Sequence, residues 1–178
     1  FVMLYSMSNM DKDKWIALVQ SINPNAVTQA EQGSSSDTAN TQGMTQEEVD
    51  ANMEEIYQAL TQYAQTAGLT DQVSVSKGSG YVFVSFDDAV FFDGNSYELR
   101  DEGKVVLDEV AKPLAEASQS INEVRVLGHT AQADPNRQNY VDYDRFLASN
   151  RATVVTIYLQ EKNVIDPARL ISVGYGQW

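Results

Sequence analysis

Strand-like and helix-like hydrophobic patterns alternate over residues 73–176, and this order restricts the possible folds more than any other feature of the chain. The turn-forming segment 77–80 lies between two strand-like runs. In the first, Val73 and Val75 alternate with polar residues, and the second covers residues 81–86, so the pair predicts a β-hairpin. After the hairpin we predict a helix, a strand, a helix and a strand at residues 102–118, 124–127, 144–162 and 170–173. We therefore expect an α/β (α+β) sandwich, a mixed sheet with helices packed on one face.

The segment before the hairpin predicts a longer amphipathic helix. Thr45 and Glu48 form a capping box, and the helix is expected to run to about Ala67. Its apolar residues recur at alternating spacings of four and three, as in a coiled-coil seam, at Val49, Met53, Ile56, Leu60 and Tyr63. Such a seam either packs on its own domain or forms a dimer contact, and two heptads do not decide between these alternatives.

The chain begins with a short apolar run that is too brief to span a bilayer, which needs about 20 apolar residues. Residues 1–7 are expected to be either the outer end of a transmembrane helix or a hydrophobic N-terminus packed on a core. Residues 11–22 predict a short amphipathic helix with apolar side chains at helical spacing, namely Trp15, Leu18, Val19 and Ile22.

Residues 24–43 contain one large apolar residue, Val27, among many Ser, Gln, Thr, Asn and Gly residues. This composition predicts a flexible linker. The expected organisation is therefore a membrane-end and amphipathic helical segment, a linker, an amphipathic helix with a possible dimer contact, and a globular domain, at residues 1–23, 24–43, 44–70 and 71–178.

The chain is acidic, with a formal net charge of −13 and no Lys or Arg between Lys14 and Lys77. Because contacts to phosphates need clustered basic side chains, this charge argues against a nucleic-acid partner. The absence of cysteine excludes disulfides and thiolate metal sites. We predict no cofactor and no metal.

The residues that could support catalysis lack the patterns that catalysis needs. His129 is the only histidine, no G-x-S-x-G motif accompanies it, and no metal-ligand spacing surrounds it. We expect it to hydrogen-bond the loop that follows its strand. The acidic pairs Asp87-Asp88 and Asp142/Asp144 are interpreted as solvated loop residues rather than as a general acid and base. The chain is therefore predicted to be a binding module, with a hydrolase using His129 as the alternative.

Arg151 is the basic residue best placed for a ligand. It lies near the start of the predicted 144–162 helix, on the side that faces the loop after Thr130. A guanidinium group at such a junction can bind a carboxylate with two hydrogen bonds. Arg151 therefore either binds a ligand or forms a structural salt bridge to one of the many acidic residues.

Four ordered segments, which cover about residues 81–176, resemble the OmpA-like peptidoglycan-binding domain. They are FDDAVFFDGNSYELRDEG, VRVLGHT, DRFLASNRATVV and DPARLISVGYG. The resemblance implies an OmpA-like sandwich that binds the diaminopimelate part of the peptidoglycan stem peptide. It also implies a closing helix and strand after residue 176, where only Gln177 and Trp178 follow, so we expect the sheet to lack an edge strand.

In this family an arginine and an aspartate hold the ligand, and the arginine corresponds to Arg151. The aspartate that follows the G-H-T motif is replaced by Ala131, and the asparagine at the helix start is replaced by Asp144. Either Asp144 or Asp134 supplies the missing carboxylate, with a loop after Thr130 that is longer than usual for the family, or the chain binds its ligand in a different mode or weakly. Other family positions along the same groove correspond to Asp93, Asn95 and Thr130.

The opening run FVMLYSMSNMD resembles the membrane exit of the flagellar motor stator B subunits (MotB), one branch of this family. This resemblance implies a single-pass protein of the inner membrane whose 1–178 region lies on the extracytoplasmic side. Residues 11–22 then correspond to a plug that controls ion flow. The implied partners are peptidoglycan, the stator subunit MotA and a second copy in a homodimer. The alternative is a generic envelope anchor of the lipoprotein type without a motor.

Overall fold

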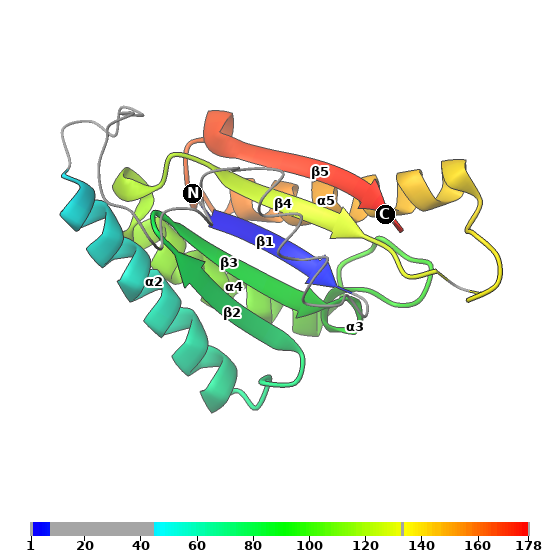
Figure 1. Ribbon diagram of the computed structural model, residues 1–178, viewed down its shortest axis with the longest axis horizontal. Coiled ribbons are helices and arrows are strands. Elements are labelled where there is room, and N and C mark those ends of the chain that lie inside the picture. Colours follow the sequence, from blue (N-terminus) through cyan, green and yellow to red (C-terminus); the bar gives the residue numbers. More distant parts are fainter. Residues whose placement is uncertain (1, 8–44, 133, 178) are drawn as a thin grey trace, which may run out of the picture.

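The computed structural model describes residues 2–7, 45–132 and 134–177, which form a five-stranded sheet with helices packed against it (Figure 1). The strand order is β2-β3-β1-β4-β5. β1 is parallel to both β3 and β4, β4 is parallel to β5, and β2 is antiparallel to β3. The sheet is therefore mixed, as predicted. The strands are β1 Val2–Met7, β2 Val73–Gly78, β3 Tyr81–Asp87, β4 Val124–His129 and β5 Leu170–Gly176.

Three long helices share one hydrophobic core with the sheet, and Figure 1 shows α4 and α5 behind the sheet and α2 beside β2. Alternate residues of β3 face this core, namely Val82, Val84 and Phe86. The expected fold class, a mixed sheet with helices packed on it, is confirmed. The helices are α2 Gln46–Thr66, α4 Asp101–Glu116 and α5 Val141–Glu161, with the short segments α3 Asp88–Phe91, η2 Ser118–Ser120 and η3 Pro167–Arg169.

Helix α2 begins at the predicted capping box. The Thr45 hydroxyl accepts a hydrogen bond from the Glu48 backbone N–H at 3.3 Å, and the Glu48 carboxylate accepts one from the Thr45 N–H at 2.8 Å. The apolar seam then turns inward, because Met53, Ile56 and Leu60 are each at most 2% exposed. Of the two alternatives for this seam, packing on its own domain is the one observed for Met53, Ile56 and Leu60.

Helix α5 packs with its backbone directly against the sheet because two glycines lie beneath it. Gly128 of β4 and Gly174 of β5 are paired in register. A Cβ atom on Gly128 would lie 2.1 Å from the backbone oxygen of Ala148, and one on Gly174 would lie 2.2 Å from the hydroxyl of Ser149. This contact fixes the first turns of α5 above the ends of β4 and β5, where the candidate site is found.

The other end of α5 is tied to α4 by polar contacts. The Asp108 carboxylate accepts hydrogen bonds from the Tyr158 hydroxyl at 2.9 Å and from the Lys162 ammonium at 2.8 Å. The hydrogen bond from Lys162 holds the pKa of the Asp108 carboxyl below its ordinary value. Both ends of α5 are therefore fixed, one by backbone contact and one by an ion pair.

The N-terminal run differs from one sequence-based expectation. Residues 1–7 were a candidate for the outer end of a transmembrane helix, but Val2–Met7 form β1 at the centre of the sheet. Val2 is in register with Val82 on one side and Val124 on the other, so the backbone groups of this strand find partners on both sides. The helical expectation is therefore wrong for residues 2–7, because a short run rich in β-favouring residues joins the ladders of two neighbours. The sheet edges are β2 and β5.

Two further expectations fall outside the described residues. They are the amphipathic helix at 11–22, with Trp15, Leu18, Val19 and Ile22, and the linker at 24–43. Within the described ranges, none of the helices combines the length and the apolar character needed to cross a bilayer.

Candidate functional site

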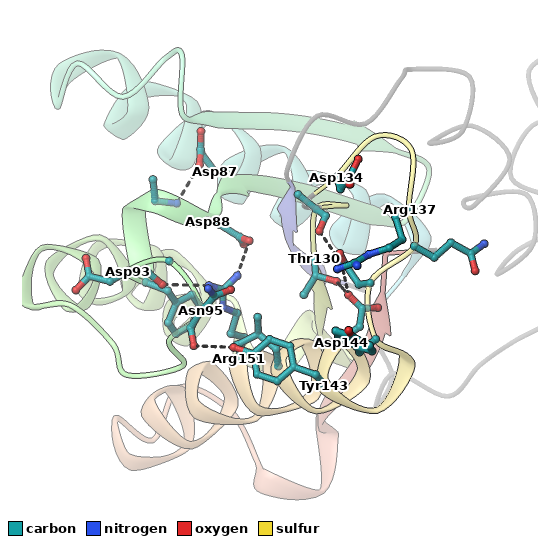
Figure 2. A pocket seen from close by; sticks show the side chains of 18 residues that line it. Asp87, Asp88, Asp93, Asn95, Thr130, Asp134, Arg137, Tyr143, Asp144 and Arg151 are labelled. Atoms are coloured by element: carbon teal, nitrogen blue, oxygen red, sulfur yellow. Dashed lines mark hydrogen bonds and ion pairs between the residues drawn. The ribbon is translucent and has the colours of Figure 1, made fainter.

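A cavity of about 520 Å³ lies at the edge of the sheet where β3 and β4 end. Because β3 and β4 are both parallel to β1, their carboxyl ends meet at this edge, which is the usual place for ligands in open α/β sheets. The cavity walls come from the start of α3, the loop at 92–95, residues 130–131 and 134–140, and the first turns of α5. Figure 2 shows side chains from these four segments pointing toward a common space.

All five residues predicted to bind a ligand line this cavity. Residues separated by more than fifty positions in the sequence are brought together by the parallel strands and by the close packing of α5. The five residues are Asp93, Asn95, Thr130, Asp144 and Arg151.

Arg151 is 7% exposed, and its guanidinium is engaged within the chain. It donates to the Asp88 carboxylate at 2.6 Å, to the backbone oxygen of Ser96 at 2.8 Å and to that of Asp93 at 3.2 Å. The guanidinium carbon also lies 5.0 Å from the centre of the Phe92 ring. Of the two roles predicted for Arg151, the structural salt bridge is the one observed, and it holds the loop that forms one wall of the cavity.

Asp144 is 3% exposed and accepts hydrogen bonds from three segments. Its Oδ1 accepts from the Thr130 hydroxyl and from the Asn139 amide at 2.8 Å, and its Oδ2 accepts from the Gln177 N–H at 2.8 Å. A carboxylate has about four acceptor positions, so most of those of Asp144 are already used. Asp144 therefore joins the end of β4, the 131–140 loop and the end of β5, and supports the second wall.

Replacing Asp144 with alanine is expected to destabilise this wall. Three donors lose their acceptor, which lowers the free energy of unfolding by about 2 kcal/mol. Amide hydrogen exchange is expected to accelerate at Gln177 and in the 131–140 loop while α2 stays protected. Unchanged exchange at Gln177 would contradict the role given to Asp144. Asp142→Ala is the matched control, because Asp142 is exposed on the same first turn.

Asp134, the other residue expected to replace the family aspartate, lies on the outer part of the loop. It is exposed, and its carboxylate accepts from the Asn136 N–H at 2.9 Å within a turn. The same turn is closed by a hydrogen bond of 3.0 Å from the Arg137 N–H to the Asp134 backbone oxygen. The Asp134 carboxylate therefore shapes the loop that carries Arg137.

The sequence-based interpretation missed part of the site. The pair Asp87-Asp88 was expected to be solvated. This holds for Asp87, which is exposed and caps α3, but not for Asp88, whose side chain is 18% exposed and bonded to Arg151. Arg137, Asn139, Tyr140 and Tyr143 were not identified, although all four line the cavity. The turn at Asp134 and the aromatic residues near Arg137 were the available signals. His129 is buried, stacks on Tyr175 at 4.8 Å and does not line the cavity.

The charge of the cavity is predominantly negative. Five aspartates and two arginines line it, which leaves a formal charge of −3, and the aspartates are Asp87, Asp88, Asp93, Asp134 and Asp144. These carboxylates are spread around the walls, and in the described part of the chain no three acidic or histidine side chains gather as metal ligands would. The arrangement suits a ligand with a cationic group and at least one anionic group.

Comparisons with known proteins agree with this fold. Residues 91–177 match the OmpA family. The chain is 25% identical over 176 residues to the uncharacterized protein YtxE of Bacillus subtilis (strain 168), a match that covers 98% of this chain and 71% of that protein. Residues 91–177 are thus similar to OmpA-like domains, and they contain most of the cavity walls.

Two solved structures share the fold. A crystal structure described as a putative MotB-like protein from Desulfovibrio vulgaris has a TM-score of 0.56 at 17% identity and covers 72% of this chain and 79% of its own. The cell wall anchor of the type VI secretion system (T6SS) from Pseudomonas aeruginosa has a TM-score of 0.55 at 21% identity and covers 66% of this chain and 79% of its own. At these identities the likeness concerns the fold alone.

Proposed function

We propose that this OmpA-like domain is a non-enzymatic anchor that binds peptidoglycan in the cavity at the ends of β3 and β4. The observation that carries the proposal is the convergence of all five predicted ligand residues on one cavity, and all five lie inside the segment that matches the OmpA family. A solved structure of similar fold is described as a cell wall anchor, which supports the same role here.

The ligand proposed for the cavity is the diaminopimelate end of the stem peptide, which carries a carboxylate and an ammonium group on one carbon. The aspartates around the cavity suit the ammonium group, and a guanidinium suits the carboxylate. Since the chain has a net charge of −13, long-range attraction to a partly anionic wall polymer contributes nothing. Binding should therefore be local and should depend weakly on salt.

Co-sedimentation with purified peptidoglycan sacculi tests this proposal. We expect the chain to pellet with sacculi and an excess of a soluble tripeptide that ends in diaminopimelate to release it. The same tripeptide with lysine in place of diaminopimelate lacks one carboxylate and is expected to release much less. No pelleting at low and moderate salt, or equal release by both peptides, would contradict the proposed site.

The same sacculi provide a test for catalysis. We propose that the chain binds without turnover, because the one histidine stacks on Tyr175 outside the cavity lining. Prolonged incubation is expected to release no soluble fragments above a heat-treated control. Release that is lost in His129→Ala would support a hydrolase instead.

A finer alternative is the flagellar stator role. The opening run of the chain and the fold shared with a protein described as MotB-like favour it. In this role the chain is a single-pass protein of the inner membrane, forms a homodimer, binds MotA and uses residues 11–22 as a plug. It also needs residues 2–7 to continue a membrane helix, whereas β1 uses them in the sheet, so the generic anchor is our first choice.

Co-purification from membranes separates the two roles. If full-length chain is captured together with a MotA-type subunit, the stator role is supported. If the chain binds sacculi but retains no MotA-type subunit in the same detergent, the generic envelope anchor stands.

A further inference from the structure

We infer that Arg137, and not Arg151, is the residue that binds the ligand's carboxylate in this chain, an inference that rests on the proposed peptidoglycan-binding function. Both arginines line the cavity. They differ in what already surrounds the guanidinium group.

Arg151 has little left to offer a ligand. Its Nε and both terminal nitrogens donate within the chain, and its charge faces the Asp88 carboxylate at 2.6 Å. A second carboxylate would have to displace Asp88 or a backbone oxygen, and it would meet the negative charge of Asp88 at close range. Arg151 is therefore a positioning residue that holds the 92–96 loop.

Arg137 differs from Arg151 in its exposure and in its ion pairing. It is exposed at the cavity wall, and across the described residues its guanidinium forms no ion pair. It lies over the ring of Tyr140, with 5.5 Å between the guanidinium carbon and the ring centre. Such stacking leaves the edge of the guanidinium plane, which carries the N–H groups, open for a carboxylate.

The backbone around Arg137 is well placed for this role. The turn from Asp134 to Arg137 is closed by one backbone hydrogen bond and by one from the Asn136 N–H to the Asp134 carboxylate, and the Asn139 amide donates to Asp144 at 2.8 Å. The guanidinium thus extends from a segment that is held on one side by the turn at Asp134 and on the other by the hydrogen bond of Asn139. Figure 2 shows Arg137 on the side of the cavity opposite Asp88 and Asp93.

This placement explains how the chain manages without the family aspartate at Ala131. In the inferred binding mode, the ligand's carboxylate contacts Arg137, and its ammonium group faces the aspartates on the opposite wall. Figure 2 shows the Asp88 carboxylate directed into the cavity from this wall, whereas the 81% exposed side chain of Asp93 points away from it, with its Oδ1 3.8 Å from the Nε of Arg100. The ligand's carboxylate and ammonium groups therefore point in opposite directions to those in a site where Arg151 binds the carboxylate.

The test compares variants of the full chain in binding to sacculi and to two tripeptides, one ending in diaminopimelate and one in which its side-chain carboxylate is amidated. For Arg137→Ala we expect at least a tenfold loss of affinity for the acid and little change for the amide. Arg137→Lys should restore part of the affinity, because it returns the charge without the two-pronged geometry. Arg145→Ala is the matched control, an exposed arginine of α5 that does not line the cavity.

The outcomes separate this inference from the proposed function. If the wild-type chain binds sacculi and Arg137→Ala binds the acid as tightly as wild type does, the inference is overturned while the anchor role stands. If wild type binds neither sacculi nor peptides, the proposed function fails first. The thermal midpoint of Arg137→Ala should equal that of wild type, and a clear drop would overturn the view that Arg137 is reserved for a ligand.

Discussion

Arg151→Met is expected to lower the free energy of unfolding by about 3–5 kcal/mol. Methionine keeps much of the side-chain volume but leaves the Asp88 carboxylate, 18% exposed, without the guanidinium 2.6 Å away. It also removes the donors to the backbone oxygens of Ser96 and Asp93. Urea unfolding followed by circular dichroism measures the loss as a lower midpoint at an unchanged slope.

A double variant separates the charge from the packing. Adding Asp88→Asn to Arg151→Met removes the uncompensated negative charge, so we expect the double variant to be more stable than Arg151→Met alone. Arg151→Lys is expected to fall between wild type and Arg151→Met, since one ammonium group cannot reach all three acceptors. A loss below about 1 kcal/mol in Arg151→Met would place this pair with ordinary exposed ion pairs and contradict its structural role.

Gly128→Ala is expected to lower the free energy of unfolding by about 3 kcal/mol. Its new Cβ would lie 2.1 Å from the backbone oxygen of Ala148 and 3.3 Å from the Ala152 side chain. Backbone atoms cannot rotate away as a flexible side chain can, so α5 must move off the sheet. Thermal or urea unfolding measures the stability, and faster amide exchange in α5 than in α2 would locate the change.

Gly94→Ala is the control for this prediction. A Cβ atom at Gly94 meets no atom within 4 Å, so its effect should stay within about 0.5 kcal/mol. Equal effects at the two positions would show that loss of backbone freedom, and not the α5 contact, decides the result. Such an outcome would contradict the close-packing explanation for the position of the site.

Local sequence signals predicted the elements whose structure is set locally. The capping box at Thr45 fixed the start of α2, and the 77–80 turn predicted the pairing of β2 with β3. The start of α5 was predicted at residue 144 but lies at Val141, because an exposed first turn carries no apolar period. β1 could not be predicted, since a short apolar run becomes a strand only through partners far away in the chain.

The site was predicted in its location but not in its division of roles. Arg151 and Asp144 were identified from ordered motifs, yet their partners lie far away, as with Asp88, which is 63 positions from Arg151. No local pattern reveals which acidic residue will neutralise a given arginine. Arg137 lies in a loop without periodicity, and only the fold shows that this loop closes the cavity.

The place of β1 in the sheet determines how the molecule carries a mechanical load. β1 runs parallel to β3 and β4, so Val2 lies at the end of the sheet opposite the cavity. A pull applied at Val2 and resisted by a ligand in the cavity acts along the strand axis. The hydrogen bonds on both sides of β1 are then loaded in shear, and they must break together rather than one at a time. The central strand thus makes the sheet strongest along the line from its N-terminal end to the cavity.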